Sequence, residues 1–469
     1  MAPDKVTAES RNENAITLAA ALGLSHEEAS RALNLNVLVT AGDDDLIGRR
    51  FAQEVSDLLV RTVEVVSTTS VDQADAEIVI GLAPSRSKAV KIFVCLNEHE
   101  AIISSRPCAD TRCQSALKIF DLIAACYACA MTLYYATGSQ LPSGMQDPLT
   151  VRHSDFGVDL SDVERPIDIG HAYLAGAGAI GNGFLWAARH LQFHGRLEIV
   201  DDDDVSPGNL NRQVWFDTDD IGKPKAVRLA ARAQESFPNL TLIPRQQRLQ
   251  NLPERSEGPW LERLIVAVDS RRARRKLQME IPGEVFDAST TDIREIVLHH
   301  HCQPNASACL CCIYEQDEEE VTREKHIADH LGISVDEVRK ERISAASATV
   351  IAQRFPKLSA TNLVGTAYDS LFKALCSEGQ LKDVADKRVI APFSFVSVLA
   401  GSLLALELVR RLGNSRSDVD FNYWRLSPWH APLPRRRVLR AKQHNCEFCG
   451  ESILTRLATQ FWADRSLQT

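Results

Sequence analysis

The sequence predicts a two-lobed α/β protein with a small helical insert, and three observations support this fold class. Apolar runs alternate with amphipathic helical segments in residues 1–150 and again in residues 151–312, which is typical of parallel sheets covered by helices. A charged segment with a helical pattern follows in residues 313–387. An apolar helix then opens residues 388–469, which we expect to return to the second lobe. The 469 residues suffice for about two to four domains.

The first lobe contains three strand-like runs, which read NLNVLVT, AEIVIGL and VKIFVCLN. The loop after the first run reads AGDDD, so it lacks the glycine spacing of a phosphate cradle and puts Asp43, Asp44 and Asp45 where phosphates would bind. We therefore predict that this lobe binds no nucleotide. A cluster of Gly, Ser and Pro residues near residue 150 marks its end.

The second lobe opens with a glycine-rich loop. Gly176, Gly178 and Gly181 have the G-x-G-x-x-G spacing, directly after a strand and at the start of a helix. This arrangement lets phosphate oxygens approach the backbone at a helix N-terminus. Asp201 ends the next strand, where a carboxylate can accept hydrogen bonds from the ribose hydroxyls. A nicotinamide-dependent dehydrogenase would share all of these features.

The residues after this strand distinguish hydride transfer from reaction at the α-phosphate of a nucleotide. Asn209, Arg212 and Gln213 follow the acidic strand end, and Lys225 comes thirteen residues after Arg212. Hydride transfer has no need for two cations at the phosphate end, whereas reaction at an α-phosphate does, because negative charge builds up there and on departing pyrophosphate. A later strand ends at Asp269, which would hold Mg²⁺ or cap the following helix.

These motifs together resemble the ThiF/MoeB/ubiquitin-activating-enzyme superfamily, over residues 165–312 and 388–450. Members of that superfamily adenylate the C-terminal glycine of a β-grasp carrier protein. The resemblance implies a Rossmann-like adenylation domain that uses ATP and Mg²⁺. It also implies that the first lobe is an inactive, adenylation-like relative of the second.

The resemblance also implies roles for individual side chains. Asp201 would bind the ribose, and Asp203 would be a second acid near the nucleotide or the metal. Arg212 and Lys225 would bind phosphates, and Asp269 would serve magnesium. An arginine finger from the first lobe would complete the site, with Arg49 and Arg50 as the candidates.

The twelve cysteines include two C-x-x-C pairs with the spacing of zinc ligands, Cys309 with Cys312 and Cys446 with Cys449. Two such pairs can close a tetrahedral Cys₄ zinc site that pins the C-terminal segment to the second lobe. Cys311 leaves the identity of one ligand open.

Two further groups of potential ligands are predicted to be structural. Cys126 and Cys129 lie in an apolar helix pattern and are expected to be core thiols. His299–Cys302 reads His-His-His-Cys, but side chains alternate between faces in a strand and no partner motif is visible, so we expect no metal site there.

Cys376 lies in the helical insert, outside both C-x-x-C pairs. The resemblance implies that a cysteine in this interval attacks the carrier adenylate and forms a thioester, and a buried core thiol is the alternative. The segment around Gly332 also has the rhythm of a helix-turn-helix, but the acidic EQDEEEVTREK flank opposes binding to DNA. A small helical domain is the favoured interpretation.

The composition restricts the possible partners. The net charge of −9 argues against a general nucleic-acid binder, and the acidic, polar N-terminus lacks the pattern of a signal peptide. The longest apolar run, Leu122–Ala136, is shorter than the roughly eighteen residues of a membrane span, so we expect a buried helix, no membrane segment and a cytoplasmic protein.

The expected function is that of an activating enzyme. It would adenylate a ubiquitin-like β-grasp protein, hold it as a thioester on Cys376 and pass it to a ubiquitin-conjugating-like enzyme. The alternative within the superfamily is adenylation of a sulfur carrier protein without a thioester. A nicotinamide-dependent oxidoreductase and a DNA-binding regulator are disfavoured by the Arg212/Lys225 pair and the acidic charge. A monomer and a homodimer both fit the sequence.

Overall fold

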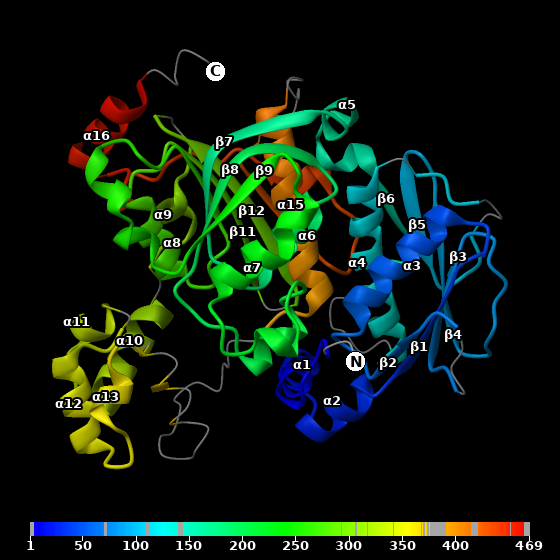
Figure 1. Cartoon of the computed structure of the whole chain (residues 1–469), viewed down its shortest axis with the longest axis horizontal. Helices are drawn as coiled ribbons and strands as arrows, with labels where there is room; N and C mark the ends of the chain where they lie inside the picture. The colour runs from blue at the N-terminus through cyan, green and yellow to red at the C-terminus, as the bar shows by residue number, and fades with distance from the viewer. Residues whose placement is uncertain are drawn as a thin grey trace. The chain divides into compact units, whose positions relative to one another are not determined.

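The computed structural model confirms the mixed α/β fold class and contains two sheets rich in parallel strands (Figure 1). It describes residues 4–69, 73–108, 112–115, 117–138, 144–291, 293–304, 307–316, 318–340, 342–366, 368, 371–372, 375, 391–413, 421–450 and 452–463. The chain divides into two compact units. One comprises Met1–Ile313 and Ile390–Thr469 and holds both sheets, and the other is Tyr314–Val389.

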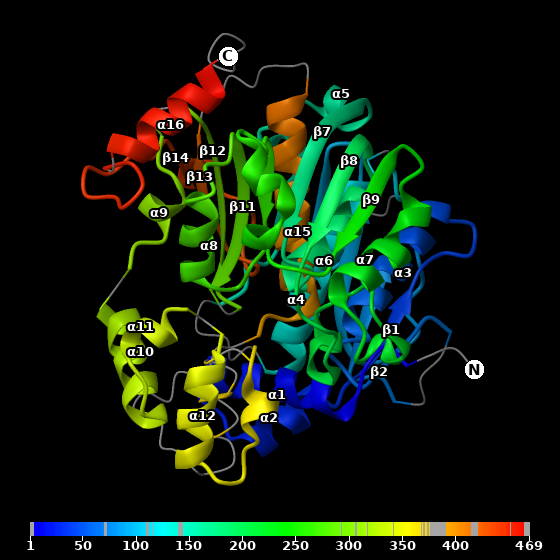
Figure 2. The ribbon, with the colours of Figure 1, turned by 60° about the vertical axis from the view of Figure 1, so that its left-hand side comes forward.

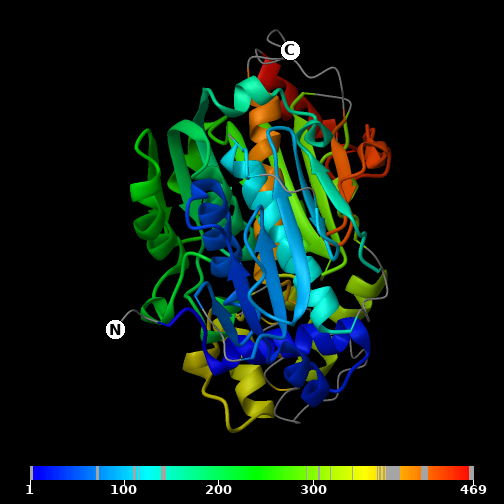
Figure 3. The same cartoon turned by 90° about the vertical axis from the view of Figure 1, so that its right-hand side faces the viewer.

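The N-terminal sheet has six strands in the order β2-β1-β3-β4-β5-β6 (Figure 3). The first four strands in that order are parallel, and β5 and β6 are added antiparallel. The elements of this lobe are α1 (Ala8–Leu22), α2 (His26–Leu33), β1 (Asn36–Thr40), α3 (Leu46–Leu59), β2 (Val65–Ser67), β3 (Ala76–Ile80), β4 (Val90–Leu96), β5 (Glu100–Ser104), α4 (Lys118–Ala136) and β6 (Leu149–Arg152).

The acidic loop after β1 has a structural use. Asp45 is the N-cap of α3, and its side chain accepts a hydrogen bond from the backbone N–H of Gly48 at 2.8 Å. A capping carboxylate satisfies one of the free N–H groups at the helix start and balances the positive end of the helix dipole. The helix start that would bind a phosphate is therefore occupied by the protein's own side chain.

The second sheet has eight strands in the order β14-β13-β12-β11-β10-β7-β8-β9 (Figure 2). Strands β9, β8, β7, β10 and β11 are parallel, and the remaining three are antiparallel additions. The chain moves from β7 to β8 and β9 and then returns to the other side of β7 with β10. In such sheets, ligands bind at this point of reversal, outside the carboxyl ends of the strands.

The elements of this lobe follow in chain order. They are α5 (Leu160–Val163), β7 (Pro166–Ala175), α6 (Ala179–Ala188), β8 (Gln192–Val200), the 3₁₀ turn η2 (Pro207–Asn211), α7 (Lys225–Ala233), β9 (Leu240–Arg245), β10 (Arg263–Val266), α8 (Arg271–Gln278), β11 (Glu284–Thr291), β12 (Glu295–Cys302), α9 (Leu310–Ile313), α15 (Ser394–Leu412), β13 (Tyr423–Leu426), β14 (Arg437–Val438) and α16 (Ser452–Trp462).

Helix α15 packs against both α6 and α4, although it is far from both in the sequence. Its crossing with α6 is made by two glycines. A Cβ on Gly401 would overlap the backbone of Gly183, and a Cβ on Gly183 would meet the carbonyl oxygen of Ser397 at 2.5 Å. The two helices therefore approach with their backbones in contact.

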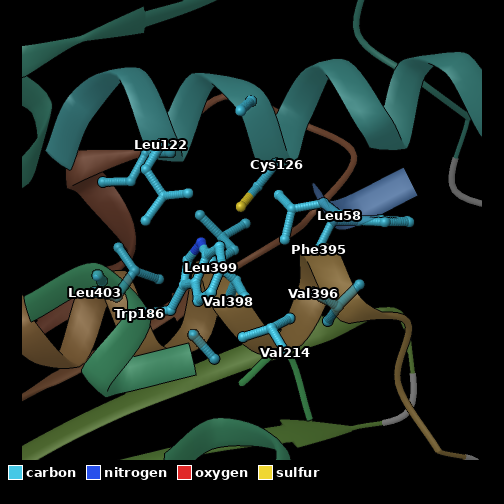
Figure 4. Close-up of a cluster of buried hydrophobic side chains, with 14 of the residues drawn as sticks. Leu58, Leu122, Cys126, Trp186, Val214, Phe395, Val396, Val398, Leu399 and Leu403 are labelled. Carbon is cyan, nitrogen blue, oxygen red and sulfur yellow. The ribbon is translucent and has the colours of Figure 1, made fainter. Parts of the chain in front are cut away.

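The core between the lobes is apolar (Figure 4). Leu122 and Cys126 of α4 face Val398 and Leu399 of α15, and the Cys126 sulfur points into this cluster (Figure 4). The prediction that Cys126 is a core thiol is confirmed, because it is 1% exposed. Helix α4 is long and apolar enough to cross a membrane, but 83% of its most apolar stretch is buried within the protein.

The second unit consists of short helices around an apolar cluster of its own. These are α10 (Glu318–Leu331), α11 (Val335–Val338), α12 (Ala345–Arg354) and α13 (Ala360–Leu363). Gly332 follows α10 with a φ of +73°, a value that glycine adopts without strain. The buried Leu375 belongs to the cluster, and Cys376, which comes next, lies outside the described residues.

Candidate nucleotide and zinc sites

The three glycines of the loop after β7 differ in whether the structure would tolerate a side chain at their positions. Gly176 has a φ of +104°, and a Cβ there would lie 2.8 Å from the carbonyl oxygen of Ala267. A Cβ on Gly181 would overlap the carbonyl oxygen of Gly176. In contrast, a Cβ on Gly178 has no described atom within 4 Å. The first and third glycines are therefore required by packing, whereas the second borders open space at the start of α6.

Asp201 connects the ends of β7 and β8. Its Oδ2 accepts a hydrogen bond from the backbone N–H of Ala177 at 2.7 Å, and its Oδ1 accepts one from the backbone N–H of Asp203 at 2.9 Å. Burial raises the pKa of Asp201 to about 6, although the positive charge of Lys225 opposes this shift. The carboxylate thus lies against the glycine loop, as a ribose ligand would require.

The other three aspartates of this stretch have separate contacts. Asp202 pairs with Arg248 at 3.3 Å. Lys225 is buried at the start of α7, and its Nζ donates to Oδ2 of Asp203 at 3.1 Å. The backbone of Asp204 forms a bridge with Pro224, just before Lys225. The carboxylates of Asp201, Asp202 and Asp203 therefore have different partners, and the contacts of Asp203 and Asp204 hold the start of α7 against the end of β8.

Asn209 and Arg212 lie in and after η2. The Oδ1 of Asn209 accepts a hydrogen bond from the backbone N–H of Ser206 at 3.1 Å, so this side chain caps η2. Arg212 donates to Oδ1 of Asn211 at 2.7 Å and to the carbonyl oxygen of Gly208 at 3.3 Å. Burial lowers the pKa of Arg212, and the negative charges of Glu13 and Asp269 act in the opposite direction. Arg212 therefore lies within the electrostatic influence of α1, through Glu13, and of the loop after β10, through Asp269.

Asp269 is exposed at the end of β10. The sequence left open whether it caps the next helix, and the structure answers that question. Ser270 is the N-cap of α8, and its Oγ accepts a hydrogen bond from the backbone N–H of Ala273. The buried Arg274 fixes the loop by donating to the carbonyl oxygen of Val268 and by pairing with Asp287. Asp269 is therefore presented towards solvent by a loop that is held in place.

Arg61 is a contact residue that sequence reasoning missed. It lies after α3 in the N-terminal lobe, is 4% exposed, and donates to the carbonyl oxygens of Leu210, Val214 and Phe216 at 2.7–2.9 Å. Burial lowers the pKa of Arg61 to about 10. A single arginine within the apolar stretch LLVRTV was the available signal. Arg61 braces the segment that carries Arg212.

Helix α1 supports the same segment. Asn211 donates to Oδ1 of Asn14 at 2.9 Å, and Thr7, the N-cap of α1, donates to the carbonyl oxygen of Pro207 at 3.1 Å. The predicted arginine-finger candidates are placed differently. Arg50 donates to Asp121 at 2.6 Å, and Arg49 is exposed on the same helix, α3.

Helix α3 contacts the end of α6 that lies away from the glycine loop. Glu54 of α3 pairs with Arg189, which directly follows α6. Of the two N-terminal elements, α1 contacts the Arg212 segment and α3 contacts the opposite end of α6. The geometry therefore offers no support for Arg49 or Arg50 as an arginine finger.

The predicted zinc ligands come together. The Sγ–Sγ distances are 3.7 Å from Cys309 to Cys312, 3.6 Å from Cys309 to Cys446, 3.7 Å from Cys312 to Cys449 and 3.4 Å from Cys309 to Cys449. A tetrahedral zinc with Zn–S bonds of about 2.3 Å separates its sulfurs by about 3.8 Å. Cys311 is not part of the group, because its Sγ donates to the carbonyl oxygen of Arg275 at 3.7 Å. The four cysteines suit a structural zinc.

The stretch His299–Cys302 has a potential partner on the neighbouring strand, and the absence of a metal site there stays a prediction. His300 and Cys302 lie with Glu284 of β11, and their ligand atoms are within 4.8 Å of one another. The partner, Glu284, comes from the neighbouring strand and belongs to no sequence motif, so it could not be recognised from the sequence.

Comparison with known proteins adds to this geometry. Residues 161–448 match the ThiF family, and residues 7–159 match the E1 N-terminal domain. An uncharacterized protein of Sinorhizobium fredii, y4jF, is 28% identical over 307 residues, which cover 61% of this chain and 58% of that protein. The chain thus spans a little more than half the length of this relative.

Two further relatives match over a shorter region. The catalytic subunit of the NEDD8-activating enzyme E1 of Saccharomyces cerevisiae is 41% identical over 78 residues, which cover 17% of this chain and 26% of that protein. The sulfur carrier protein ThiS adenylyltransferase of Escherichia coli is 39% identical over 77 residues, which cover 16% and 25%. Because the family match extends over more than half of the residues, the chain belongs to the ThiF family.

Proposed function

We propose that this protein is an activating enzyme that uses ATP and Mg²⁺ to adenylate the C-terminal glycine of a ubiquitin-like β-grasp protein. The observation that carries the proposal is the convergence of the glycine loop, Asp201, Arg212 and Asp269 at the carboxyl ends of β7, β8 and β10. The same edge carries the buried Lys225. The named relatives in the ThiF family support an acyl-adenylating chemistry.

In the proposed reaction, a carboxylate oxygen of the carrier attacks the α-phosphorus of ATP. The new bond is an acyl–phosphate anhydride, and the bond that breaks joins the α-phosphorus to the bridging oxygen of the departing pyrophosphate. Arg212 and Lys225 would stabilise the negative charge on these oxygens. Lys225 would exchange its contact with Asp203 for one with a phosphate. Mg²⁺ would neutralise the pyrophosphate, with Asp269 as its ligand from this chain.

We further propose that the Cys376 thiolate attacks the acyl carbon of the adenylate. The thioester forms as AMP leaves, and the thiol proton is released to solvent. The carrier would then move to a cysteine of a ubiquitin-conjugating-like enzyme. This step rests on sequence position alone, because Cys376 lies outside the described residues. Cytoplasmic location belongs to the same proposal.

ATP–pyrophosphate exchange with a panel of glycine-terminated β-grasp proteins tests the adenylation step. We expect exchange with the wild type and a loss of at least about 100-fold for Arg212→Ala, the size typical of removing one charge-stabilising donor. Arg248→Ala is the matched control, because Arg248 pairs with Asp202, to which the proposed reaction assigns no role. Equal exchange by Arg212→Ala and the wild type would refute the assigned role.

A non-reducing gel of the wild type and Cys376→Ala then tests the thioester step. A thiol-sensitive carrier adduct in the wild type alone supports a thioester-forming enzyme. Exchange without an adduct in either protein favours the second candidate, a sulfur-carrier adenylyltransferase, which the match to the ThiS adenylyltransferase supports.

A further inference from the structure

A second group of potential metal ligands lies at the other end of the sheet from the glycine loop. Strands β11 and β12 are neighbours in the sheet (Figure 2), and in their antiparallel register Glu284 pairs directly with Cys302. His300 lies two residues before Cys302 on the same strand. Directly opposed residues, and residues two apart on one strand, share a face of a sheet. The three side chains are therefore brought together by strand register.

The three ligand atoms converge. Oε1 of Glu284 lies 3.1 Å from Nε2 of His300, and Sγ of Cys302 lies 3.6 Å from each of these atoms. With Zn–S bonds of about 2.3 Å and Zn–N or Zn–O bonds of about 2.1 Å, a tetrahedral zinc separates sulfur from nitrogen or oxygen by about 3.6 Å and nitrogen from oxygen by about 3.4 Å. The observed triangle agrees with these separations to within a few tenths of an ångström.

A hydrogen-bonded triad explains this geometry less well. In a Cys–His–Glu relay, the imidazole uses one ring nitrogen for the thiol and the other for the carboxylate. Here the same atom, Nε2 of His300, faces both partners. The imidazole N–H and the thiol can both donate to Oε1 of Glu284, but the 3.6 Å contact between Nε2 of His300 and Sγ of Cys302 is then left without a donor, whereas one metal ion can bind all three atoms at once.

Arg263 resembles the residues that hydrogen-bond to metal ligands in known metal sites. The Nε of Arg263 donates to Oε2 of Glu284 at 2.8 Å, and Oε1 is the oxygen that faces His300 and Cys302. Such outer partners orient the ligating side chains. Glu284 is 6% exposed and His300 is 4% exposed, while Cys302 is half-buried. A bound ion would therefore be held by the buried Glu284 and His300, and solvent could reach it beside the partly exposed Cys302.

This group is separate from both sites described above. Glu284 begins β11, whereas the glycine loop and Asp201 follow the carboxyl ends of parallel strands in the same sheet. The Cys₄ group is approached from the opposite face of β12, where His299 contacts the carbonyl oxygen of Ala308, the neighbour of Cys309. Neither site uses any of these three side chains as a ligand.

We propose that Glu284, His300 and Cys302 bind a second metal ion, of the zinc class, with a fourth coordination position open to water. A mixed set of nitrogen, oxygen and thiolate donors favours Zn²⁺ over Mg²⁺ or Ca²⁺. When the ion binds, the metal–sulfur bond forms as Cys302 releases its thiol proton to solvent. The proposal is independent of the adenylation reaction.

The first test is the metal content of the full-length protein after dialysis against a buffer that holds free Zn²⁺ in the nanomolar range. We expect two zinc ions per chain in the wild type and one in Cys302→Ser. Cys108→Ser is the matched control, because Cys108 is also half-buried and its Sγ donates to the carbonyl oxygens of Phe93 and Ile102; it should retain both ions. One ion per wild-type chain, or an unchanged content in Cys302→Ser, would overturn the proposal.

Cobalt substitution identifies the ligands. In Co²⁺-loaded protein, the thiolate-to-metal charge-transfer absorption should fall by about one fifth in Cys302→Ser, because one of five thiolates is lost. His300→Ala should lose the visible bands of the second site while retaining those of the Cys₄ site. Far-ultraviolet circular dichroism identifies any variant that fails to fold, and a folded Cys302→Ser protein with the wild-type cobalt spectrum would contradict the assignment.

Discussion

In each lobe the first strand of the sheet leads through a short loop into a helix, from β1 to α3 and from β7 to α6, and the two helix starts differ in one respect. In the first lobe, the Asp45 side chain caps α3. In the second lobe, α6 starts at Gly178 and has no side-chain cap among the contacts of the described residues. A helix start that carries its own carboxylate is satisfied internally, whereas an uncapped one can receive an external anion. One lobe therefore uses its helix start for stability and the other offers it to a ligand.

The largest effect is expected from substitutions in the glycine loop, at the uncapped start of α6. Gly181→Val would drive a side chain into the carbonyl oxygen of Gly176, so we expect a loss of at least about 2 kcal/mol in the free energy of unfolding and no detectable ATP binding. Gly178→Ala is the matched control for packing, because its Cβ meets open space. It should unfold like the wild type in urea and yet bind ATP more weakly in calorimetry. Wild-type stability of Gly181→Val would contradict the packing argument.

The next largest effect is expected from Arg61, which supports the Arg212 segment and is not proposed to bind the ligand. Arg61→Ala removes a buried cation from four carbonyl oxygens, three of them in the Arg212 segment, and we expect a loss of about 3 kcal/mol in the free energy of unfolding. Pyrophosphate exchange should fall as well, because the Arg212 segment loses its support. Arg49→Ala, an exposed arginine of the same lobe, should change stability by less than about 0.5 kcal/mol. Similar losses in both variants would show that Arg61 has no special role.

A smaller effect appears in the pH dependence of stability. The pKa of Asp201 is raised from 3.8 to about 6, mainly by burial, so the folded protein binds this proton more tightly than the unfolded chain does. The free energy of unfolding of the wild type, relative to that of Asp201→Asn, should therefore fall as the pH rises from 3.8 to about 6 and stay level above that. Urea unfolding of both proteins across this range measures the difference. A difference that rises with pH would reverse the assigned shift.

The smallest effect on stability is expected from Asp45, the N-cap of α3. Asp45→Ala removes the cap of α3, so we expect a loss of about 1 kcal/mol in the free energy of unfolding and no gain of ATP binding. The exposed Asp44 provides the control, and Asp44→Ala should be close to neutral. If Asp45→Ala bound ATP in the first lobe, the cap alone would account for the difference between the lobes.

Local patterns predicted the fold and most of the candidate site residues. The glycine loop, Asp201 and the two C-x-x-C pairs are fixed by spacing within short stretches, so they could be identified from the sequence. Arg61 could not, because its partners lie about 150 positions away along the chain. Glu284 escaped notice for the same reason, since strand pairing brings it to His300 and Cys302. The exclusion of Cys311 required the direction of its side chain, which spacing does not encode.

The contact between Gly183 and Gly401 has a consequence for how the chain matures. Helix α15 follows the insert of Tyr314–Val389, yet it completes the apolar layer with α4 and α6. A nascent chain that ends before residue 390 therefore exposes the apolar faces of two finished helices. We expect neither lobe to become protease-resistant during synthesis until α15 (Ser394–Leu412) has been made and has packed against α4 and α6.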